Sequence, residues 1–573
     1  MKTGAACVID GLKKAGVKTI FGIPGGQVLD LFAALYHAPF EFILTRHEQG
    51  ATHMADGYSR ATGKVGCCLV TSGPGATNTV TGLATAYMDG IPMVCISGQV
   101  PSHMIGNDAF QEADTTGITR PVTKHNYLVK SVNDLPRIIA EAFQIAASGK
   151  PGPVLIDIPK DVQRATMTDA GATRQVIRQG KQPDLKGDPR RIRALADAIN
   201  KAQRPLLYVG GGVIAGDAAR ELTALARKAG IPVTTTLMGL GAFPETDPLA
   251  LRMLGMHGSV PANKAVSECD LLIAVGARFD DRVTGKISEF APKAIKAHID
   301  IDPSAIDKSV RTHIAVLGHV RHVLKALTPQ VRAIRRTPWL RQIHAWQKAY
   351  PLTYERNASD LLPQFVIEQV DAVTRGNAII VTDVGQHQMW ATHFFRYTRP
   401  RTFLSSGGLG TMGYGLPAAI GAQAGLRDRT VITLAGDGSI QMNFQELVVA
   451  VEHDLPVKVI ILNNGCLGMV RQWQEMFYKS EYSASQLGQS GRAKNERIRS
   501  TTNGYLPDFV KMAEAHGAVG MRVSKNREVQ PALRKALAIH RPVVIECIVR
   551  PDENVYPMVP PGASLNEMIH SMA

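Results

Sequence analysis

Two polar residues follow two apolar runs in the segment TVITLAGDGSIQMNFQELVVAVEHDLPVKVIILNN. Asp437 follows the first run, Asn464 follows the second, and a Gly-rich turn and a helical pattern lie between them. A right-handed crossover places two such strand ends side by side at the carboxyl edge of a parallel sheet, where ligands bind. Because carboxylate and amide oxygens suit Mg²⁺, we predict that Asp437 and Asn464 are metal ligands.

The glycines on either side of Asp437 indicate a second component of this site. Gly436 and Gly438 let the backbone come close to a diphosphate, and the helix that follows offers its N-terminus to the anion. An ordinary turn whose aspartate caps a helix is the alternative interpretation. The Asn463-Asn464 pair on the next predicted strand favours the magnesium and diphosphate site.

The elements that would position this site alternate along almost the whole chain. Short β-rich apolar runs alternate with helical periodicity and predict parallel α/β architecture. A polar stretch at 169–189 and a charged stretch at 329–356 divide the chain into three blocks, of which the first and third share a rhythm compatible with a distant duplication. The N-terminal run MKTGAACVIDGLKKAG lacks the apolar core of a secretion signal and predicts the first helix of the fold.

The composition excludes several classes of protein. The 573 residues suggest about three or four domains of roughly 150 residues each. A hydrophobic content of 45% excludes general disorder, and no apolar run reaches the roughly 18 residues that a membrane helix needs. The seven cysteines are scattered and never spaced CxxC, which disfavours disulfides or a zinc ribbon and predicts a cytoplasmic protein.

The net charge of +15 raises the question of nucleic-acid or membrane-surface binding. Neither of the densest basic clusters is interleaved with aromatic residues in a nucleic-acid motif, so we interpret them as solvated faces and loops. The clusters are Arg332, Arg335, Arg336 and Arg341, and Arg492, Lys494, Arg497 and Arg499.

The GDG and NN motifs resemble the cofactor motif of the thiamin-diphosphate-dependent enzymes. Further segments are similar to the catalytic large subunits of the acetohydroxyacid synthase, or acetolactate synthase, family, and the resemblance runs from about residue 3 to 568. These segments are PGG at 24–26, RHEQGA at 46–51, TSGPGATN at 71–78, DAFQEAD at 108–114, LGMHG at 254–258, RFDDRVTG at 278–285, DVGQHQMW at 383–390, GGLGTMGYGLPAAIG at 407–421 and GMVRQW at 468–473.

The resemblance implies three doubly wound parallel-sheet α/β domains. We assign residues 1–168 to a thiamin pyrimidine-binding domain, 190–328 to a central FAD-binding domain, 357–550 to a domain for thiamin diphosphate and Mg²⁺, and 551–573 to a C-terminal tail. In the family two subunits build each active site, so a homodimer is expected. The sequence leaves open a tetramer, a regulatory small subunit and feedback inhibition.

The reaction implied by the resemblance is that of a transferase in branched-chain amino-acid biosynthesis. Pyruvate is decarboxylated on thiamin diphosphate, and the hydroxyethyl carbanion condenses with pyruvate or 2-ketobutyrate. The products are 2-acetolactate and 2-aceto-2-hydroxybutyrate. Because this net reaction transfers no electrons, the FAD is expected to be structural.

Glu48 is the expected catalytic residue. By similarity, the glutamate of RHEQGA hydrogen-bonds the thiamin pyrimidine and promotes its imino tautomer, a task that suits a carboxyl held in a dry interface. A lone glutamate is usually an exposed acid, but the surrounding motif favours the catalytic role. A zinc site of the HExxH type is disfavoured because position 51 is alanine.

The same similarity assigns the other site residues. Those expected to bind thiamin diphosphate, besides Glu48, are Gly25, Gln386, His387, Gly410, Met412, Gly436, Asp437, Gly438, Ser439 and Asn464. The Cys466 backbone carbonyl is the expected third metal ligand. The FAD residues are Lys150, His257, Gly258, Arg278 and Asp300, and the substrate residues are Phe110, Gln111, Arg282 and Trp473. The triple glycine at 210–212 is compatible with a phosphate turn for FAD.

Three features depart from the family pattern. Lys150 stands where many members have arginine, and His319 where an acidic residue is common. The segment 483–505 is longer and more basic than expected and fits a lid, a subunit contact or a surface loop.

Four other functions remain alternatives. A flavin-dependent pyruvate oxidase and an FAD-free catabolic acetolactate synthase are both disfavoured by the RFDDR segment, and Trp473 also argues against the oxidase. A 2-keto acid decarboxylase would release more acetaldehyde than acetolactate. An inactive scaffold subunit is disfavoured because Glu48, Asp437 and Asn464 are all present.

Overall fold

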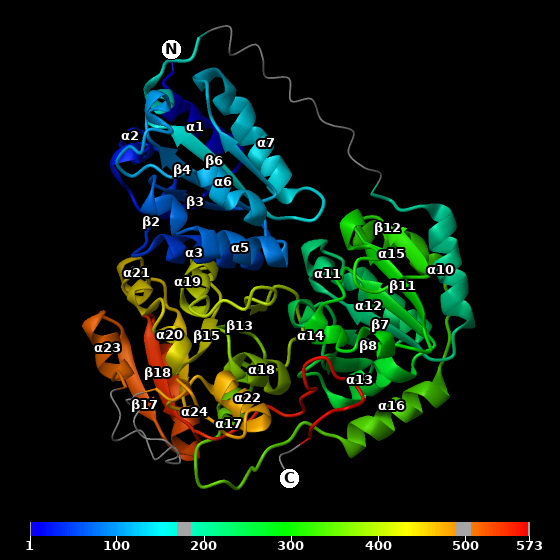
Figure 1. The fold of residues 1–573 in the computed structure, drawn as a ribbon. Helices are drawn as coiled ribbons and strands as arrows, with labels where there is room; N and C mark the ends of the chain where they lie inside the picture. The colour runs from blue at the N-terminus through cyan, green and yellow to red at the C-terminus, as the bar shows by residue number, and fades with distance from the viewer. Residues whose placement is uncertain (1, 169–184, 488–505, 571–573) are drawn as a thin grey trace.

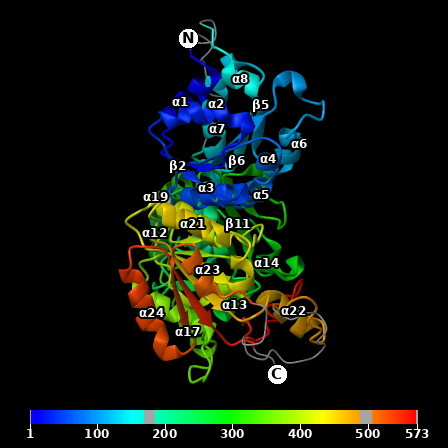
Figure 2. The same cartoon turned by 90° about the vertical axis from the view of Figure 1, so that its left-hand side faces the viewer.

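The chain forms three parallel six-stranded sheets with helices on their faces (Figure 1, Figure 2). The computed structural model describes residues 2–168, 185–487 and 506–570. We call the three sheets with their helices the first, second and third units. The first unit lies on the third, and the second lies beside both (Figure 1). The predicted α/β class of three doubly wound parallel sheets is confirmed. Within the described ranges, no helix combines the length and apolar character needed to cross a membrane.

The first unit has the strand order β2-β1-β3-β4-β6-β5. The N-terminal run forms its first helix, as predicted, and the Thr3 side chain caps that helix by accepting from the Ala6 N–H. The strands are β1 (Thr19–Gly22), β2 (Glu41–Leu44), β3 (Gly66–Val70), β4 (Met93–Gln99), β5 (His125–Leu128) and β6 (Pro153–Pro159). The helices are α1 (Gly4–Lys14), α2 (Leu29–Tyr36), α3 (Glu48–Thr62), α4 (Pro74–Thr77), α5 (Val80–Asp89), α6 (Thr115–Thr119), α7 (Leu135–Ala147) and α8 (Lys160–Arg164).

The second unit has the strand order β12-β11-β10-β7-β8-β9, the arrangement of a dinucleotide-binding sheet. The strands are β7 (Pro205–Val209), β8 (Val233–Thr235), β9 (Ala250–Met253), β10 (Leu271–Val275), β11 (Ile295–Asp300) and β12 (Ile314–Leu317). The helices are α10 (Pro189–Lys201), α11 (Gly211–Ala215), α12 (Ala219–Ala229), α13 (Val260–Glu268), α14 (Asp281–Thr284), α15 (Val320–Leu327) and α16 (Thr337–Ala349).

The third unit has the order β14-β13-β15-β16-β18-β17, which repeats the order of the first unit strand for strand. This repeat fits the duplication that the shared rhythm suggested. The strands are β13 (Ile379–Thr382), β14 (Phe403–Leu404), β15 (Val431–Gly436), β16 (Lys458–Asn463), β17 (Val519–Val523) and β18 (Val543–Ile548). The helices are α17 (Pro363–Thr374), α18 (Gln386–Phe394), α19 (Gly415–Gly425), α20 (Asp437–Ile440), α21 (Leu447–Glu452), α22 (Gly468–Phe477), α23 (Phe509–Ala515) and α24 (Asn526–Ala538).

Each sheet reverses its strand order at one internal pair of strands. These pairs are β1 and β3 in the first unit, β7 and β10 in the second, and β13 and β15 in the third. A crevice opens outside the carboxyl ends of the strands at such a point, so it is the expected position for a ligand. The predicted pairing of the GDG and NN strands is also confirmed, because β15 and β16 run parallel as neighbours.

The first and third units share one hydrophobic core between α3 and α19. Apolar residues of both helices belong to a single buried cluster. The helices touch backbone to backbone, because a Cβ added at Gly57 would lie 2.0 Å from the Ala418 carbonyl oxygen and one added at Gly421 would lie 1.8 Å from that of Met54. Glycine is therefore required at both positions for this crossing.

Two interpretations of the charged stretches need correction. The stretch at 329–356 contains helix α16, which packs on α13 and buries Trp339. Arg336 is buried and donates to the Ile199 carbonyl, whereas Arg332, Arg335 and Arg341 are exposed as predicted. Within the stretch 169–189, Pro189 starts α10, and residues 169–184 lie outside the described residues, as do the second basic cluster and residues 488–505.

A buried carboxylate of the third unit holds the N-terminus of α3. Glu446, at the end of the 3₁₀ turn η9 (Phe444–Glu446), accepts from the Arg46 N–H at 3.1 Å. Burial raises the pKa of Glu446 to about 7, hydrogen bonds from the Arg46 and His47 backbone lower it, and the nearby Glu48 raises it. The folded chain therefore favours the protonated form of this group at acidic pH.

This elevated pKa predicts a pH dependence of stability. The ordinary pKa of 4.5 rises to about 7 in the folded chain, so the contribution of Glu446 is fully present below pH 4.5 and is lost as the pH rises to about 7. Glu446→Gln therefore removes a pH-dependent contribution of up to about 3 kcal/mol to the free energy of unfolding. We therefore expect the unfolding temperature of the cofactor-free protein to fall less steeply from about pH 5 to about pH 8 in the variant. The control is Glu452→Gln, which removes the exposed partner of Arg46. The prediction would be contradicted if the unfolding temperatures of Glu446→Gln and wild type changed with pH in parallel.

Candidate functional site

Five of the predicted residues meet at the carboxyl edge of the third sheet. Gln386 and His387 open α18 after β13, Gly436 ends β15, Asp437 opens α20, and Asn464 follows β16. The Asn464 amide donates to the Gln386 side-chain oxygen at 3.3 Å, and Asp437 accepts from the Gly465 N–H at 2.8 Å. The His387 ring lies against Gly436, where an added Cβ would be 3.0 Å from Nδ1. The structure therefore brings these residues together at the strand-order reversal.

The charge at this edge fits a divalent cation. Burial raises the pKa of Asp437 to about 7, and the hydrogen bonds that lower it all come from backbone N–H groups. Among the described residues, His387 Nε2 is buried without a hydrogen-bond partner. A magnesium ion with a diphosphate would supply the positive charge that Asp437 lacks and an acceptor for His387.

The neighbouring residues Ser439 and Cys466 have different positions in this site. Ser439 accepts from the Gly436 N–H through its hydroxyl at 3.2 Å. The Cys466 N–H donates to the Asn464 side-chain oxygen at 3.2 Å, which fixes that amide. Burial raises the pKa of the Cys466 thiol to about 12, so the thiol stays protonated and the backbone carbonyl is the better metal donor. Residues 485–487 pair with 465–467 in backbone hydrogen bonds, so the described start of the 483–505 segment borders the site.

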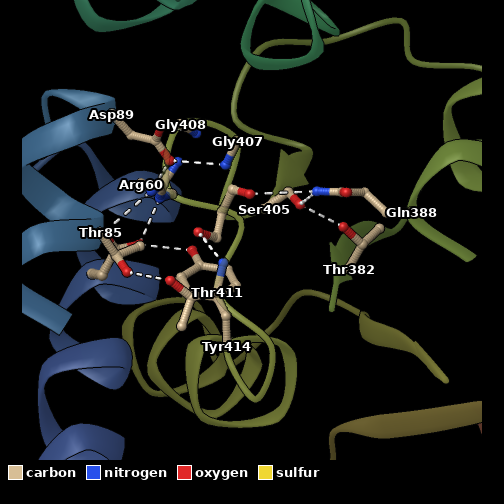
Figure 3. A network of polar contacts seen from close by, with 12 residues as sticks. Arg60, Thr85, Asp89, Thr382, Gln388, Ser405, Gly407, Gly408, Thr411 and Tyr414 are labelled. Carbon is tan, nitrogen blue, oxygen red and sulfur yellow. Dashed lines mark hydrogen bonds and ion pairs between the residues drawn. The ribbon is translucent and has the colours of Figure 1, made fainter. Parts of the chain in front are cut away.

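The segment from Ser405 to Tyr414 forms a wall next to this edge (Figure 3). Its Ser405 hydroxyl accepts from Gln388 at 2.6 Å, and the Gly413 N–H donates to Asp383 at 2.8 Å. Gly410 has φ +71, a conformation that favours glycine. Gly410 and Met412 line a large cavity that lies between the units.

This cavity has a volume of about 1110 Å³ and gathers most of the predicted FAD and substrate residues. The predicted residues in its lining are Lys150, Gly210, Gly211, Gly212, His257, Arg278, Arg282, Asp300, His319, Gly410, Met412 and Trp473. His257 Nδ1 and His319 Nδ1 are buried and lack hydrogen-bond partners among the described residues, and both histidines line this cavity of cofactor size. Gly258 is not part of the lining, since an added Cβ would meet the Leu254 carbonyl carbon at 2.4 Å. The donor set and the volume fit FAD.

Arg282 and Trp473 form a stacked pair in the cavity wall. The Arg282 guanidinium, from α14 of the second unit, lies 5.7 Å from the ring centre of Trp473, on α22 of the third unit. Trp473 Nε1 is buried and without a partner among the described residues. A guanidinium next to an aromatic wall can hold a carboxylate and an alkyl group at once.

Glu48 lies in a different cluster, at the strand-order reversal of the first sheet. Its carboxylate accepts from the Asn78 amide at 3.0 Å, and it lies 3.6 Å from the position of a Cβ added at Gly75. Gly25 contacts Thr71 in the same crevice. Within the described residues, no hydrogen bond or ion pair joins Glu48 to Asp437, and Glu48 does not line the large cavity. One chain therefore carries two separate clusters of predicted residues, which we call the first half-site, around Glu48, and the third-unit half-site, around Asp437.

The two predicted residues from DAFQEAD lie near this first half-site. Gln111 has φ +59 and lies against Gly73, where an added Cβ would be 2.8 Å from the Gln111 carbonyl oxygen. Phe110 is 84% exposed, so its ring is free to contact another molecule.

Several polar residues of the site escaped the sequence prediction. Glu446, Asn78, Arg60 and Asp89 hold predicted residues or their neighbours in place. Asn78 was detectable as the last residue of TSGPGATN. The other three act across the contact between units, which residue spacing does not reveal.

Comparison with known proteins supports the same interpretation. Three family profiles match: the N-terminal TPP binding domain of thiamine pyrophosphate enzymes at residues 2–118, the central domain at 192–327, and the C-terminal TPP binding domain at 383–547. The chain is 48% identical to an acetolactate synthase of Mycobacterium bovis, covering 99% of this chain and 91% of the relative. It is 47% identical to an acetolactate synthase large subunit of Corynebacterium glutamicum, covering 100% and 90% respectively. It is 49% identical to one of Parasynechococcus marenigrum, covering 99% and 91%.

The strand-order reversals, the GDG and NN strand ends and the full-length similarity agree with one another. The chain therefore belongs to the thiamine pyrophosphate enzymes and, among them, to the family of acetolactate synthase large subunits.

Proposed function

We propose that the chain is the catalytic subunit that decarboxylates pyruvate and joins the remaining two carbons to a second 2-keto acid. The acceptor is pyruvate or 2-ketobutyrate, and the products are 2-acetolactate or 2-aceto-2-hydroxybutyrate for branched-chain amino-acid biosynthesis. The observation that carries this proposal is the stacked Arg282–Trp473 pair in the cavity that Gly410 and Met412 also line. The guanidinium would hold the substrate carboxylate, and the indole would border the alkyl group of the acceptor.

The third-sheet edge would hold thiamin diphosphate and Mg²⁺. Asp437, Asn464 and the Cys466 carbonyl would bind the metal, while His387, Gln386, Ser439 and the glycines around Asp437 would face the diphosphate. Bound thiamin diphosphate would supply the electron sink for decarboxylation. FAD would occupy the other end of the large cavity, against Lys150, His257, Arg278 and Asp300, as a structural group.

Glu48 would hold a proton at the pyrimidine ring. Because its own chain keeps it apart from Asp437, we propose that the first half-site of one copy meets the third-unit half-site of a second copy in a homodimer. Asn78 would fix the direction of the Glu48 carboxylate through its hydrogen bond. The Trp473 indole would help to exclude water, whose protons would divert the reaction to acetaldehyde.

The remaining assignments follow from the same proposal. We place the domain boundaries at 1–168, 190–328 and 357–550, with a tail from 551. The large-subunit names of the relatives support a regulatory small subunit as a partner. A cytoplasmic location fits the seven cysteines, all of which are buried and free.

A product assay tests the function. Purified protein with pyruvate and 2-ketobutyrate should form both acetohydroxy acids in excess over acetaldehyde, and only when thiamin diphosphate, Mg²⁺ and FAD are all supplied. Glu48→Gln should lower the rate by about 100-fold or more, because it removes the proton-holding carboxyl. Glu41→Gln, which removes the partly exposed partner of Arg427 in the same unit as Glu48, is the control and should retain activity. Excess acetaldehyde, or electrons passed to an acceptor, would overturn the proposal.

Competition between the two acceptors tests the role of Trp473. Trp473→Leu should lower the preference for 2-ketobutyrate over pyruvate by about tenfold, because the wall for the extra methylene is lost. Trp473→Phe keeps a ring beside Arg282, so its preference for 2-ketobutyrate should lie between those of wild type and Trp473→Leu. Trp346→Leu in α16 is the control. The measurement is the ratio of the two products at equal acceptor concentrations, and an unchanged ratio in Trp473→Leu would rule out this role.

A further inference from the structure

A buried charged cluster joins the first unit to the wall of the candidate site (Figure 3). Arg60, at the end of α3, contacts Asp56 at 2.5 Å and Asp89 at 2.8 Å, and the three side chains are 5%, 0% and 2% exposed. The Tyr414 hydroxyl donates to Asp56 at 2.7 Å. Burying an arginine and two carboxylates costs free energy that apolar packing would avoid, so the cluster calls for a role beyond stability.

The Asp89 carboxylate also accepts hydrogen bonds from the backbone of the third unit. It accepts from the Gly407 N–H at 3.1 Å and from the Gly408 N–H at 2.7 Å. One turn earlier on α5, the Thr85 hydroxyl contacts the Thr411 hydroxyl at 2.8 Å. A single helix face of the first unit therefore holds the segment at both ends of the Leu409–Gly410 turn.

The second unit also contacts the same segment. A Cβ added at Gly408 would lie 3.0 Å from Arg278 Nη2, and one added at Gly407 would lie 2.4 Å from the Met238 sulfur. Arg401 donates to the Arg60 carbonyl at 3.0 Å and to the Ile214 carbonyl at 3.4 Å. The segment 407–412 thus lies where all three units meet.

We propose that Asp89, oriented by Arg60, is a positioning residue that fixes Gly407 and Gly408 and thereby sets the place of Gly410 and Met412 in the active site. We call the contacts of Asp89 and Thr85 with the segment 407–412 the clamp. The clamp rests on the contacts described above, whereas its effect on thiamin diphosphate binding rests on the proposed function. Helix α3 carries Glu48 as its first residue and Arg60 near its end, so one helix supports groups of both half-sites.

The test compares Asp89→Asn and Thr85→Val with wild type. Asparagine keeps the shape of Asp89 but loses the charge and presents an amide to the glycine N–H donors, and valine removes the Thr411 contact. Hydrogen–deuterium exchange of the cofactor-free protein should accelerate by about tenfold in peptides covering 407–412 of Asp89→Asn, and less in Thr85→Val. Peptides covering β15 and β16 should not change. The control Asp30→Asn removes an exposed ion pair with Arg164 and should match wild type.

Calorimetry provides the functional measurement. The affinity of Asp89→Asn for thiamin diphosphate with Mg²⁺ should fall by about tenfold, since charge-assisted hydrogen bonds are among the stronger ones. The KM for pyruvate should stay unchanged, because the Arg282–Trp473 pair is intact. If Asp89 had only a structural role, the substitution would lower the unfolding temperature but would not weaken thiamin diphosphate binding while leaving the KM for pyruvate unchanged.

The outcomes separate the two proposals. Unchanged exchange at 407–412, or unchanged thiamin diphosphate affinity, in a folded Asp89→Asn would overturn the positioning role. If Asp89→Asn does not fold, Thr85→Val decides by the same two measurements. If wild type binds no thiamin diphosphate, the proposed function fails, and the exchange experiment still decides whether the clamp exists.

Discussion

The close crossing of α3 and α19 is the constraint on which the rest of the structure depends. Gly57 and Gly421 let two backbones touch, so the first and third units share one core. A side chain at either position would push the helices apart, because close-packed interiors have no spare volume. Polar contacts between these two units lie near both ends of α3, where Glu446 accepts from the Arg46 N–H and the Tyr414 hydroxyl donates to Asp56.

The strand order explains why polar groups gather where they do. In every unit the reversal point lies at the carboxyl ends of two strands whose connections leave in opposite directions, which opens a crevice. The glycines at 210–212 follow β7, Glu48 and Gly25 flank the β1–β3 crevice, and Asp437 follows β15. The strand order fixes where these groups lie, while the residues in the loops after the strands determine their chemistry. This is also why the repeat of one strand order in the first and third units yields two half-sites of different chemistry.

Residue patterns predicted the parts of this fold that depend on local sequence. The buried runs became strands, and the neighbouring positions of β15 and β16 followed from the crossover rule, which placed Asp437 beside Asn464. Helix α16 was missed because the arginines just before it gave the stretch 329–356 a charged, solvated character, which concealed the four-residue spacing of Trp339 and Ile343 on the buried face of the helix. Glu446 and Asp89 were missed for a different reason. Each acts on backbone atoms more than 300 residues away, and no spacing rule reports a contact between units.

Under the proposed function, the shared cavity would give a physical role to a flavin that transfers no net electrons. Most of the residues assigned to FAD line one continuous volume together with Arg282 and Trp473, and Arg278 approaches Gly408 in the segment that carries Gly410 and Met412. A large planar group bound against Arg278 and His257 would fill the space behind that segment and keep water from entering it. In the proposed site, Asp89 would support the segment 407–412 from the first unit and the flavin would support it from the second, while Glu48 would hold the proton at the pyrimidine ring.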